Sequence, residues 1–567
     1  MRKHARLIVL LVALAMALSA CGGGTPAPAA TTAAAATEAA TTAAAAAATE
    51  AATTTAAGTT AAGAAATTAA AAATVAATTP QAAPAQIEED LPFVSLYYFF
   101  TGSDQDDLPL VQAAMDEYFM ERLNCTVTLT PIPGGEWSTR VPMLFSAGEQ
   151  IDLIFDQSNR GYYTNVANGA YHPLNDLFAQ YAPDAMAHMA VNAPGIIDAP
   201  KVAGELYGVP CQKQTPQSEA WYYRKDIADA IGMDVDSLVT LQDLEPYLIK
   251  IQESYPEMTP YYLSSSSGIN MEWATDAIRD NPYRYEELTG AITLLIVDLE
   301  ENKVLNHFET EWDLDRFETL KRWQDMGLIN PDAATTTTGG GDMFRAGKTW
   351  FIGAGGSPTT LSQMQTSYGT DFYRWRCTPP IVNTYQNVTA LTCIPQSSID
   401  KERAMMVINL FHSDPVIINL FNSGIEGKHH VIDENGRFAL PEGVTTKGET
   451  GYAFGFETFF GNMFLNTLWY NETEDRYDEL REYNFESRQS KIMGFYVNME
   501  NITTEYAAVE SVRVQYVPIL KAGVSPNVAE TLREMNEKMY ANGLQKVIDD
   551  AQRQYDEFIA ANNMRVD

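Results

Sequence analysis

The sequence has little positive charge. Its 567 residues include 37 lysines and arginines against 72 aspartates and glutamates, which gives a formal net charge of −35 at pH 7. Nucleic acids and anionic lipid surfaces are bound through a positive field, so this charge argues against both kinds of partner. Firm attachment to a membrane would therefore need a feature other than surface charge.

Cysteine is also scarce, with five residues in the chain. No CxxC pair and no cysteine and histidine cluster has the spacing of a zinc site, so we expect no structural metal and no cofactor. Cys125, Cys211, Cys377 and Cys393 lie in the body of the chain. Cys377 and Cys393 are close enough to bridge a strand pair in an exported protein, and four buried thiols are the alternative.

Long hydrophobic runs are missing as well. The apolar run of residues 7–18 follows Arg2, Lys3 and Arg6 and ends in LSAC at 18–21. It is too short for a bilayer core of about 30 Å, which needs about 20 helical residues. Residues 1–20 therefore have the form of a signal peptide, and LSAC resembles a lipobox in which Cys21 is lipidated after cleavage. A generic signal peptide with a chance cysteine is the alternative.

Residues 21–86 consist almost entirely of alanine and threonine after the first few positions, with Glu38 and Glu50 the only charges beyond residue 24. Such a composition cannot bury large side chains, so we expect a disordered tether. Its coil would span roughly 40–50 Å.

The globular part begins near residue 87 with a β-rich run at 93–100. A helical face with three- and four-residue spacing follows, and then a second strand at 126–132. This strand, helix, strand order predicts an α/β fold with a parallel sheet covered by helices. Asp104, Asp106 and Asp107 precede the helix, where negative residues suit a helix N-terminus or a cation. The helical face is formed by Leu108, Val111, Met115, Tyr118 and Phe119.

A further α/β unit is expected over residues 137–163. It has a helix and a glycine turn over residues 137–149, a short buried strand at 151–155 and a polar and aromatic loop at 156–163. Ligands in open α/β sheets gather at such strand ends. Beyond it we expect a hairpin at 204–210, a strand leading into a helix at 221–226 and an amphipathic helix at 241–252.

The order of these segments resembles the family 1 extracellular solute-binding proteins of ABC importers. The motifs are MLFSAGE at 143–149 with IDLIF at 151–155, GELYGVP at 204–210 with YRKD at 223–226, FRAGK at 344–348, and PQSS at 395–398. Glu205 stands where the family usually has lysine. The C-terminal part resembles the LipO-like subgroup with a DUF3502 domain. Its motifs are GIEGKHH at 424–430, FFGN at 459–462, GFY at 494–496 and a closing helix pair that begins at Ser525 and Pro526.

The resemblance implies a two-lobe, periplasmic-binding-protein-like fold of type II, a Venus flytrap with a hinge between the lobes. We expect residues 87–212 plus 377–440 in lobe 1 and residues 213–376 plus 441–567 in lobe 2. It also implies a monomer that captures a solute in the interlobe cleft and delivers it to a membrane permease. The protein would be held by lipid on the extracytoplasmic side.

Many relatives bind sugars, which require aromatic faces and planar polar groups. Candidate ligand contacts lie at expected strand ends or loops, although core packing is the alternative for each tryptophan. They are Trp137, Ser158, Asn159, Arg160, Trp221, Tyr223, Trp273, Gly355, Gly356, Ser357 and Trp469.

Catalytic residues are not predicted. No Gly-x-Ser-x-Gly or His-Glu-x-x-His motif is present, and neither glycine cluster, at 339–341 and 353–356, is a P-loop. His429 and His430 would point to opposite faces of a strand and form no metal pair. An anchored hydrolase with paired carboxylates stays open as the alternative function, and an adhesive surface protein is a third.

Overall fold

The structure, a computed structural model, describes residues 91–264, 284–288, 294–454 and 457–562. Its first sheet has the strand order β2-β1-β3-β13-β4. β1 runs parallel to β2 and β3, which confirms the predicted strand, helix, strand unit, whereas β13 is antiparallel to both of its neighbours. The strands are β1 Val94–Thr101, β2 Cys125–Ile132, β3 Leu153–Asp156, β4 Gly208–Pro210 and β13 Leu391–Cys393.

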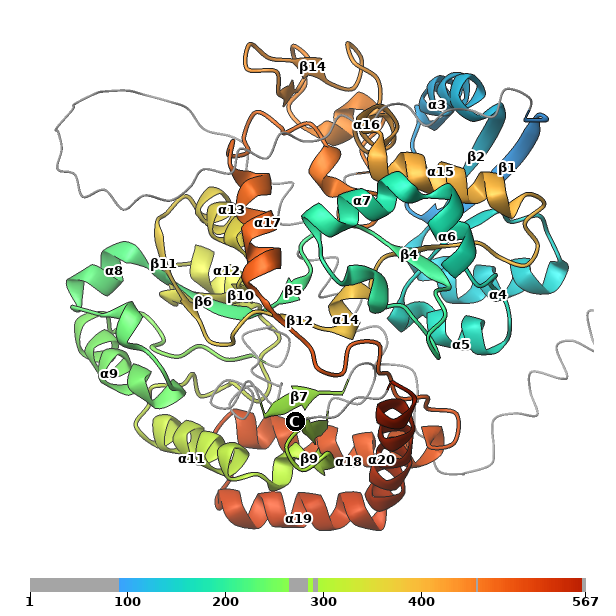
Figure 1. The fold of residues 1–567 in the computed structure, drawn as a ribbon. Coiled ribbons are helices and arrows are strands. Elements are labelled where there is room, and N and C mark those ends of the chain that lie inside the picture. Colours follow the sequence, from blue (N-terminus) through green and yellow to red (C-terminus); the bar gives the residue numbers. More distant parts are fainter. Residues whose placement is uncertain (1–90, 265–283, 289–293, 455–456, 563–567) are drawn as a thin grey trace, which may run out of the picture. The chain divides into compact units, whose positions relative to one another are not determined.

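Helices cover this sheet (Figure 1). In α3, Val111, Met115, Phe119 and Leu123 recur every four residues and are buried, because this spacing places them on one face. The covering helices are α3 Leu108–Leu123, α4 Trp137–Ala147, α5 Tyr162–Ala167, α6 Asn175–Tyr181, α7 Pro183–Asn192, α15 Lys401–Ser413 and α16 Pro415–Ser423.

A second body is built on the antiparallel sheet β10-β6-β11 and the small sheet β7-β8-β9. Its strands are β6 Glu219–Arg224, β7 Tyr285–Glu287, β8 Leu295–Asp298, β9 Lys303–Asn306, β10 Phe351–Gly355 and β11 Phe372–Arg376. Its helices are α8 Lys225–Ala230, α9 Glu245–Ser254, α11 Glu311–Asp325, α12 Gly340–Arg345, α13 Pro358–Tyr368, α18 Thr503–Lys521, α19 Val528–Ala541 and α20 Leu544–Ala561.

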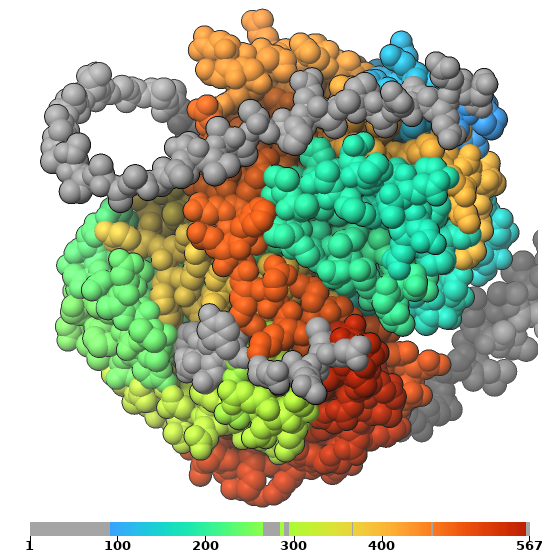
Figure 2. Space-filling model, viewed as in Figure 1, coloured from blue at the N-terminus to red at the C-terminus, as the bar shows by residue number. Residues whose placement is uncertain are grey.

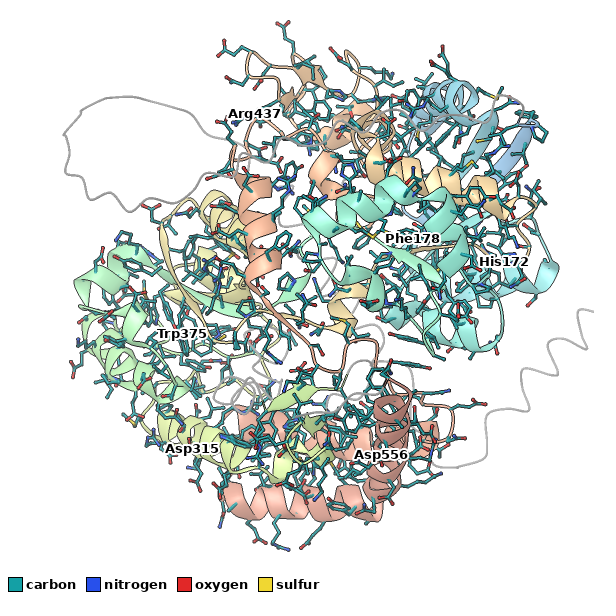
Figure 3. The ribbon with its side chains drawn as sticks, viewed as in Figure 1. His172, Phe178, Asp315, Trp375, Arg437 and Asp556 are labelled. Atoms are coloured by element: carbon teal, nitrogen blue, oxygen red, sulfur yellow. The ribbon has the colours of Figure 1, made fainter. Side chains whose placement is uncertain are left out.

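Each body has its own hydrophobic core. Figure 3 labels Phe178, which belongs to the first core, and Trp375, which belongs to the second. These two cores give the structure the two lobes that the resemblance implies.

Three crossings between the lobes meet in one small sheet, β16-β12-β5. β5, Pro216–Gln217, leads from β4 to β6, and β12, Ile381–Val382, leads from β11 back to β13. β16, Arg488–Gln489, leads from α17, Arg476–Glu486, toward α18. We call β5, β12 and β16 the hinge sheet. β13 enters the first sheet through this hinge, which accounts for its antiparallel direction.

Helix α17 is held to the first lobe by buried polar groups. The Nε atom of Arg481 donates to Oδ1 of Asn192 over 2.9 Å, and Nδ2 of Asn484 donates to the Asn192 carbonyl over 2.7 Å. Asn484 in turn accepts from the backbone N–H of Thr215 over 2.9 Å. In Figure 2, the orange α17 segment lies between the teal segment that carries α7 and the yellow segment that carries α13.

The lobe boundaries stay a prediction, and the packing leads us to propose one change. Tyr452, Phe454 and Phe460 pack in the core of the first lobe, although residues 441–567 were expected in the second. We propose that the first lobe continues to about residue 460. Short elements complete the described fold: α14 Thr384–Asn387, β14 Val431–Ile432 and β15 Phe438–Ala439.

Candidate ligand-binding site

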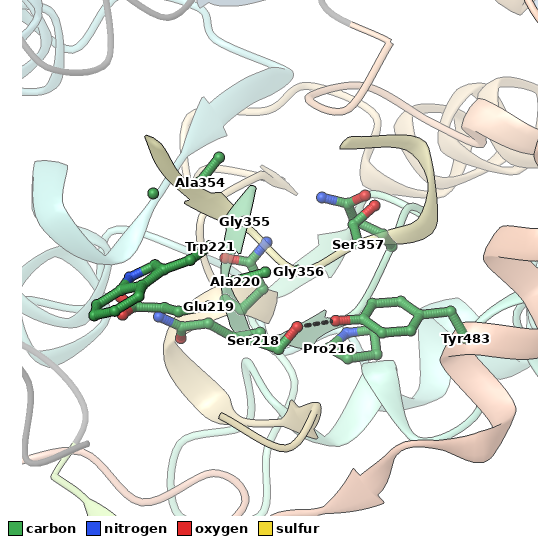
Figure 4. Close-up of a pocket in the computed structure, with 14 residues that line it drawn as sticks. Pro216, Ser218, Glu219, Ala220, Trp221, Ala354, Gly355, Gly356, Ser357 and Tyr483 are labelled. Atoms are coloured by element: carbon green, nitrogen blue, oxygen red, sulfur yellow. Dashed lines mark hydrogen bonds between the residues drawn. The ribbon is translucent and has the colours of Figure 1, made fainter. Parts of the chain in front are cut away.

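A pocket opens beside the hinge sheet (Figure 4). Its volume is about 350 Å³, within the range of about 300–1,000 Å³ typical of small-ligand sites. All three crossings contribute: Gln217 from the first, Gln386 of α14 from the second and Tyr483 of α17 from the third. The lining residues are Gln214, Pro216, Gln217, Ser218, Glu219, Ala220, Trp221, Gly353, Ala354, Gly355, Gly356, Ser357, Gln386 and Tyr483.

Ser218 and Tyr483 close one side of the pocket. Their hydroxyl oxygens are 2.6 Å apart and share a hydrogen bond, drawn as a dashed line in Figure 4. The backbone N–H of Gly356 donates to the Ser218 carbonyl over 2.8 Å. A Cβ atom at position 356 would lie 2.3 Å from Oγ of Ser218, so only glycine fits here without displacing that hydroxyl.

The loop at 355–357 is fixed through its carbonyl groups. Tyr222 donates to the Gly355 carbonyl over 2.6 Å, and Nε of Arg376 donates to the Gly356 carbonyl over 2.9 Å. Arg374 donates to the Ser357 carbonyl over 3.1 Å. The absence of a side chain at Gly356 lets the backbone of this loop approach Ser218 closely in the pocket wall.

Four of the predicted contacts line the pocket: Trp221, Gly355, Gly356 and Ser357. Trp221 also packs against Tyr261, Phe351 and Trp375 in the core, and its side chain is almost fully buried. Only the edge of the indole is therefore available to a ligand.

A second group of predicted residues lies at the strand ends of the first lobe. Arg160 donates to Oγ1 of Thr101 over 2.9 Å, and its guanidinium lies 5.5 Å from the ring centroid of Trp137. The Nε1 of Trp137 is buried without a hydrogen-bond partner among the described residues. Asn159 is exposed. The N–H of Ser158 donates to the Val388 carbonyl over 2.8 Å, which joins this loop to the segment just after α14.

The remaining predicted contacts lie elsewhere. Tyr223 is fully buried against Trp350 and Phe351. Trp469 is buried against Phe438, with Nζ of Lys447 3.5 Å from its ring centroid. Trp273 and Cys21 are outside the described residues.

Sequence reasoning missed the polar lining of the pocket. Gln214, Gln217, Ser218, Glu219, Gln386 and Tyr483 were not among the predicted contacts. A usable signal was present, since Gln212, Gln214 and Gln217 crowd the segment where the chain was expected to cross between lobes.

Carboxyl groups in and beside the pocket have altered acidity. Burial, with a smaller contribution from the nearby carboxyl of Glu287, raises the pKa of Glu219 to about 8. Burial also raises the pKa of Glu287 to about 7. Among the described residues, no three histidine, cysteine, aspartate or glutamate side chains are grouped to hold a metal ion.

Several residues singled out in the sequence have structural roles. Asp107 accepts from Lys428 over 3.0 Å and from His429 over 3.2 Å instead of capping α3. Nδ1 of His430 hydrogen-bonds the Ser423 carbonyl, so the two adjacent histidines have separate partners. The four cysteines of the globular part are buried free thiols, so the weighed bridge between Cys377 and Cys393 is not formed.

No single helix among the described residues is long and apolar enough to cross a bilayer. The pair α15 and α16, bent by 83° between its helices, meets that test of length and composition when taken together.

The two-lobe fold with a pocket beside its hinge is the architecture of a binding protein, and comparison with known proteins agrees. Residues 101–358 match the model of the bacterial extracellular solute-binding proteins, and residues 491–560 match the domain of unknown function DUF3502. The predicted resemblance is thereby confirmed: the chain carries the extracellular solute-binding domain of ABC importers followed by DUF3502, and it acts outside the cytoplasm. It is a binding protein, and the alternative of an anchored hydrolase is not supported.

Individual relatives align with most of the length of this chain. A carbohydrate ABC transporter substrate-binding protein of Streptococcus pneumoniae serotype 4 (strain ATCC BAA-334 / TIGR4) is 25% identical over 83% of this chain and 91% of its own length. The crystal structure of the N-glycan transport protein NgtS of S. pneumoniae is 21% identical, with a TM-score of 0.68 over 82% of this chain and 99% of that one.

A solute-binding protein of Bifidobacterium longum infantis described as binding HMO is 14% identical, with a TM-score of 0.57 over 82% of this chain and 99% of that one. At these identities the likeness of the structures establishes the fold.

Proposed function

We propose that the chain captures a neutral saccharide in the hinge pocket and delivers it to the permease of an ABC importer. The observation that carries the proposal is the pocket itself, to which all three crossings contribute. The matched relative is named as a carbohydrate-binding component, and NgtS has been crystallised with Man1GlcNAc and Man5GlcNAc.

The pocket chemistry supports a saccharide. Amide groups of Gln214, Gln217 and Gln386 and the hydroxyls of Ser218 and Tyr483 line it, and they can both donate to and accept from sugar hydroxyl groups. The Tyr483 ring and the indole edge of Trp221 offer apolar surface for the C–H face of a sugar ring.

Bending at the hinge sheet would bring the two lobes together around a bound ligand. A ligand shifts the equilibrium toward a closed state only if it makes contacts there that the open state lacks. We propose that Ser158, Asn159, Arg160 and the edge of Trp137 supply those contacts from the first lobe, because their loop is bonded to the segment after α14. Tyr223 and Trp469 are buried in their lobes, and we propose for them a supporting role.

We propose further that Cys21 carries the lipid and that residues 21–86 tether a monomer to the outer side of the membrane. The cysteine follows a signal-peptide pattern, and the tether composition favours coil. A tethered carrier meets its permease at a high effective concentration.

Isothermal calorimetry of the chain without residues 1–86 tests capture against neutral mono- and oligosaccharides, including Man1GlcNAc. Saturable binding, with the sugar recovered unchanged, is the expected result. Binding that persists when Tyr483 and Ser218 are both replaced by alanine would place the ligand elsewhere. Turnover of any sugar would overturn the proposal.

A further inference from the structure

Glu219 lies in the pocket wall at the start of β6, and its backbone is fixed. In the sheet it pairs with Gly355 of β10, and its carbonyl accepts from the N–H of Cys377 over 3.0 Å. Its own N–H meets Oγ1 of Thr378 at 2.8 Å. The sheet therefore fixes the backbone position from which this carboxyl group extends.

The side chain of Glu219 lies on the face of β6 that is turned toward the core of the second lobe. Alternate residues of a strand share a face, so Glu219 lies on the same face of β6 as Trp221, which is part of the core. The carboxyl group forms no hydrogen bond and no ion pair with the residues that the structure describes, yet it borders the pocket. A partly buried carboxyl group without a partner is costly unless it is neutral or meets a ligand.

The charged groups that face Glu219 favour its neutral form. Glu287, at the end of β7, is a second carboxyl group, and its repulsion outweighs the attraction of Lys521 at the end of α18. Together with burial they raise the pKa of Glu219 to about 8. We therefore expect Glu219 to present a carboxyl O–H to the pocket at pH 7.

We propose that Glu219 makes the pocket selective for uncharged ligands that carry hydroxyl or carbonyl oxygens, because its neutral carboxyl group donates a hydrogen bond to the bound ligand. The inference rests on the proposed capture of a saccharide and adds a specificity residue to it. Of the described lining residues, Glu219 alone carries a carboxyl group, so its protonation decides whether the pocket is charged.

Affinity measured against pH tests the inference, with Man1GlcNAc as the probe. If only the neutral form binds, the apparent affinity follows the neutral fraction and falls about tenfold between pH 7 and pH 9. Glu219→Gln, whose amide donates at every pH, should bind within about twofold of the wild type at pH 7 and show no such fall. Glu253→Gln, which removes an exposed carboxyl on α9, is the matched control and should follow the wild type.

A ligand-free measurement separates this inference from the proposed function. Because the folded chain holds a proton on Glu219 that the unfolded chain releases near pH 4.5, stability should fall as the pH rises from about 4.5 through about 8. The melting temperature of Glu219→Gln should fall less over pH 6 to 9 than those of the wild type and Glu253→Gln.

The outcomes are distinct. Pocket affinity independent of pH in the wild type, or equal melting profiles for Glu219→Gln and Glu253→Gln, would overturn the inference alone. Tighter binding of a glucosamine disaccharide than of Man1GlcNAc would also overturn it, because the pocket would then receive a cation. Failure of every sugar to bind at any pH would overturn the proposed function and the inference together.

Discussion

Gly356 determines the width of the pocket at the residue scale. Gly356→Ala would place a methyl group 2.3 Å from Oγ of Ser218 and displace the hydroxyl from Tyr483. We expect affinity for the bound sugar to fall by about tenfold, the cost of losing roughly one hydrogen bond to the ligand. Calorimetry measures the loss. Gly448→Ala is the control, since an added Cβ there meets nothing within 4 Å. Equal affinities for both variants would contradict the assignment of the pocket.

His412 makes the free energy of unfolding depend on pH in the acidic range. It is buried, and its Nδ1 lies 3.1 Å from Nε2 of Gln212, so Nδ1 accepts and the ring is neutral. Burial lowers the pKa of His412 to about 3. The unfolded chain binds the proton near pH 6.5, so stability should be lost as the pH falls from about 6.5 to about 3, at up to about 1.4 kcal/mol per pH unit.

Chemical unfolding at several pH values checks this dependence. His412→Asn keeps an acceptor for Gln212 but does not titrate, and its stability should decline less steeply over pH 6.5 to 4. His172→Asn removes a less buried histidine and should change the slope less. A greater effect at position 172 would mean that His412 is not the responsible group.

At the residue scale, the sequence predicts which types of residue line a binding site better than it predicts where a particular residue lies in the fold. Core packing was the alternative for each candidate tryptophan, and Trp469 is indeed buried, but burial depends on neighbours far away in the chain. Tyr483 could not be found, because its place in the pocket depends on bonds from α17 to Asn192 and Thr215.

At the element scale, the first residues of the DUF3502 region connect the two lobes. Ile492, Phe495 and Val497 pack in the core of the second lobe, while Met493 and Tyr496 pack against the first. Gly494 donates its N–H to Oγ1 of Thr384 over 2.8 Å. Residues 492–497 therefore form a strap, named here for its contacts with both cores.

One contact of the strap with the first lobe is a stack of two rings. Tyr163 and Tyr496 have centroids 3.5 Å apart and planes 4° from parallel. A double-mutant cycle with Tyr163→Ala and Tyr496→Ala should give a coupling free energy of about 0.5–1.5 kcal/mol. Tyr496→Phe keeps the ring and serves as the control. Additive effects of the two alanine substitutions would show that the strap does not couple the lobes through this stack.

Helices and strands whose residues follow a local periodic pattern were predicted well. Elements whose position depends on contacts with the other lobe were not. The expected strands at 93–100 and 126–132 correspond to β1 and β2, and the apolar face Val528, Leu532, Met535 and Met539 is buried in α19. The expected start of this helix at Ser525 and Pro526 was wrong, because α19 begins at Val528 and its N-cap is Asn527, whose side chain accepts from the N–H of Glu530. Asn527 is as good a cap as serine, so sequence alone could not choose between them.

At the scale of the whole molecule, the pocket and the hinge are one structure. The segments that cross between the lobes also supply Gln217, Gln386 and Tyr483 to the pocket wall. On the proposed function, a ligand bound there would touch the segments whose backbone bends when the lobes move, and ligand binding would be coupled directly to closure. This coupling would need no chain of contacts through either hydrophobic core.

Delivery of the sugar to a permease requires the protein to stay at the membrane, and Cys21→Ser tests whether Cys21 provides this attachment. Serine has no thiol to accept a lipid, so the variant should leave the membrane fraction while its sugar affinity, measured by calorimetry, stays within about twofold. Uptake of labelled sugar by cells should fall by about 10²-fold, because the carrier would lose the effective concentration that the tether provides. Thr25→Ser, a change in the tether that spares the cysteine, should alter neither location nor uptake. Retention of Cys21→Ser at the membrane would show that another feature holds the protein there, and reduced affinity would show that tether and pocket are coupled.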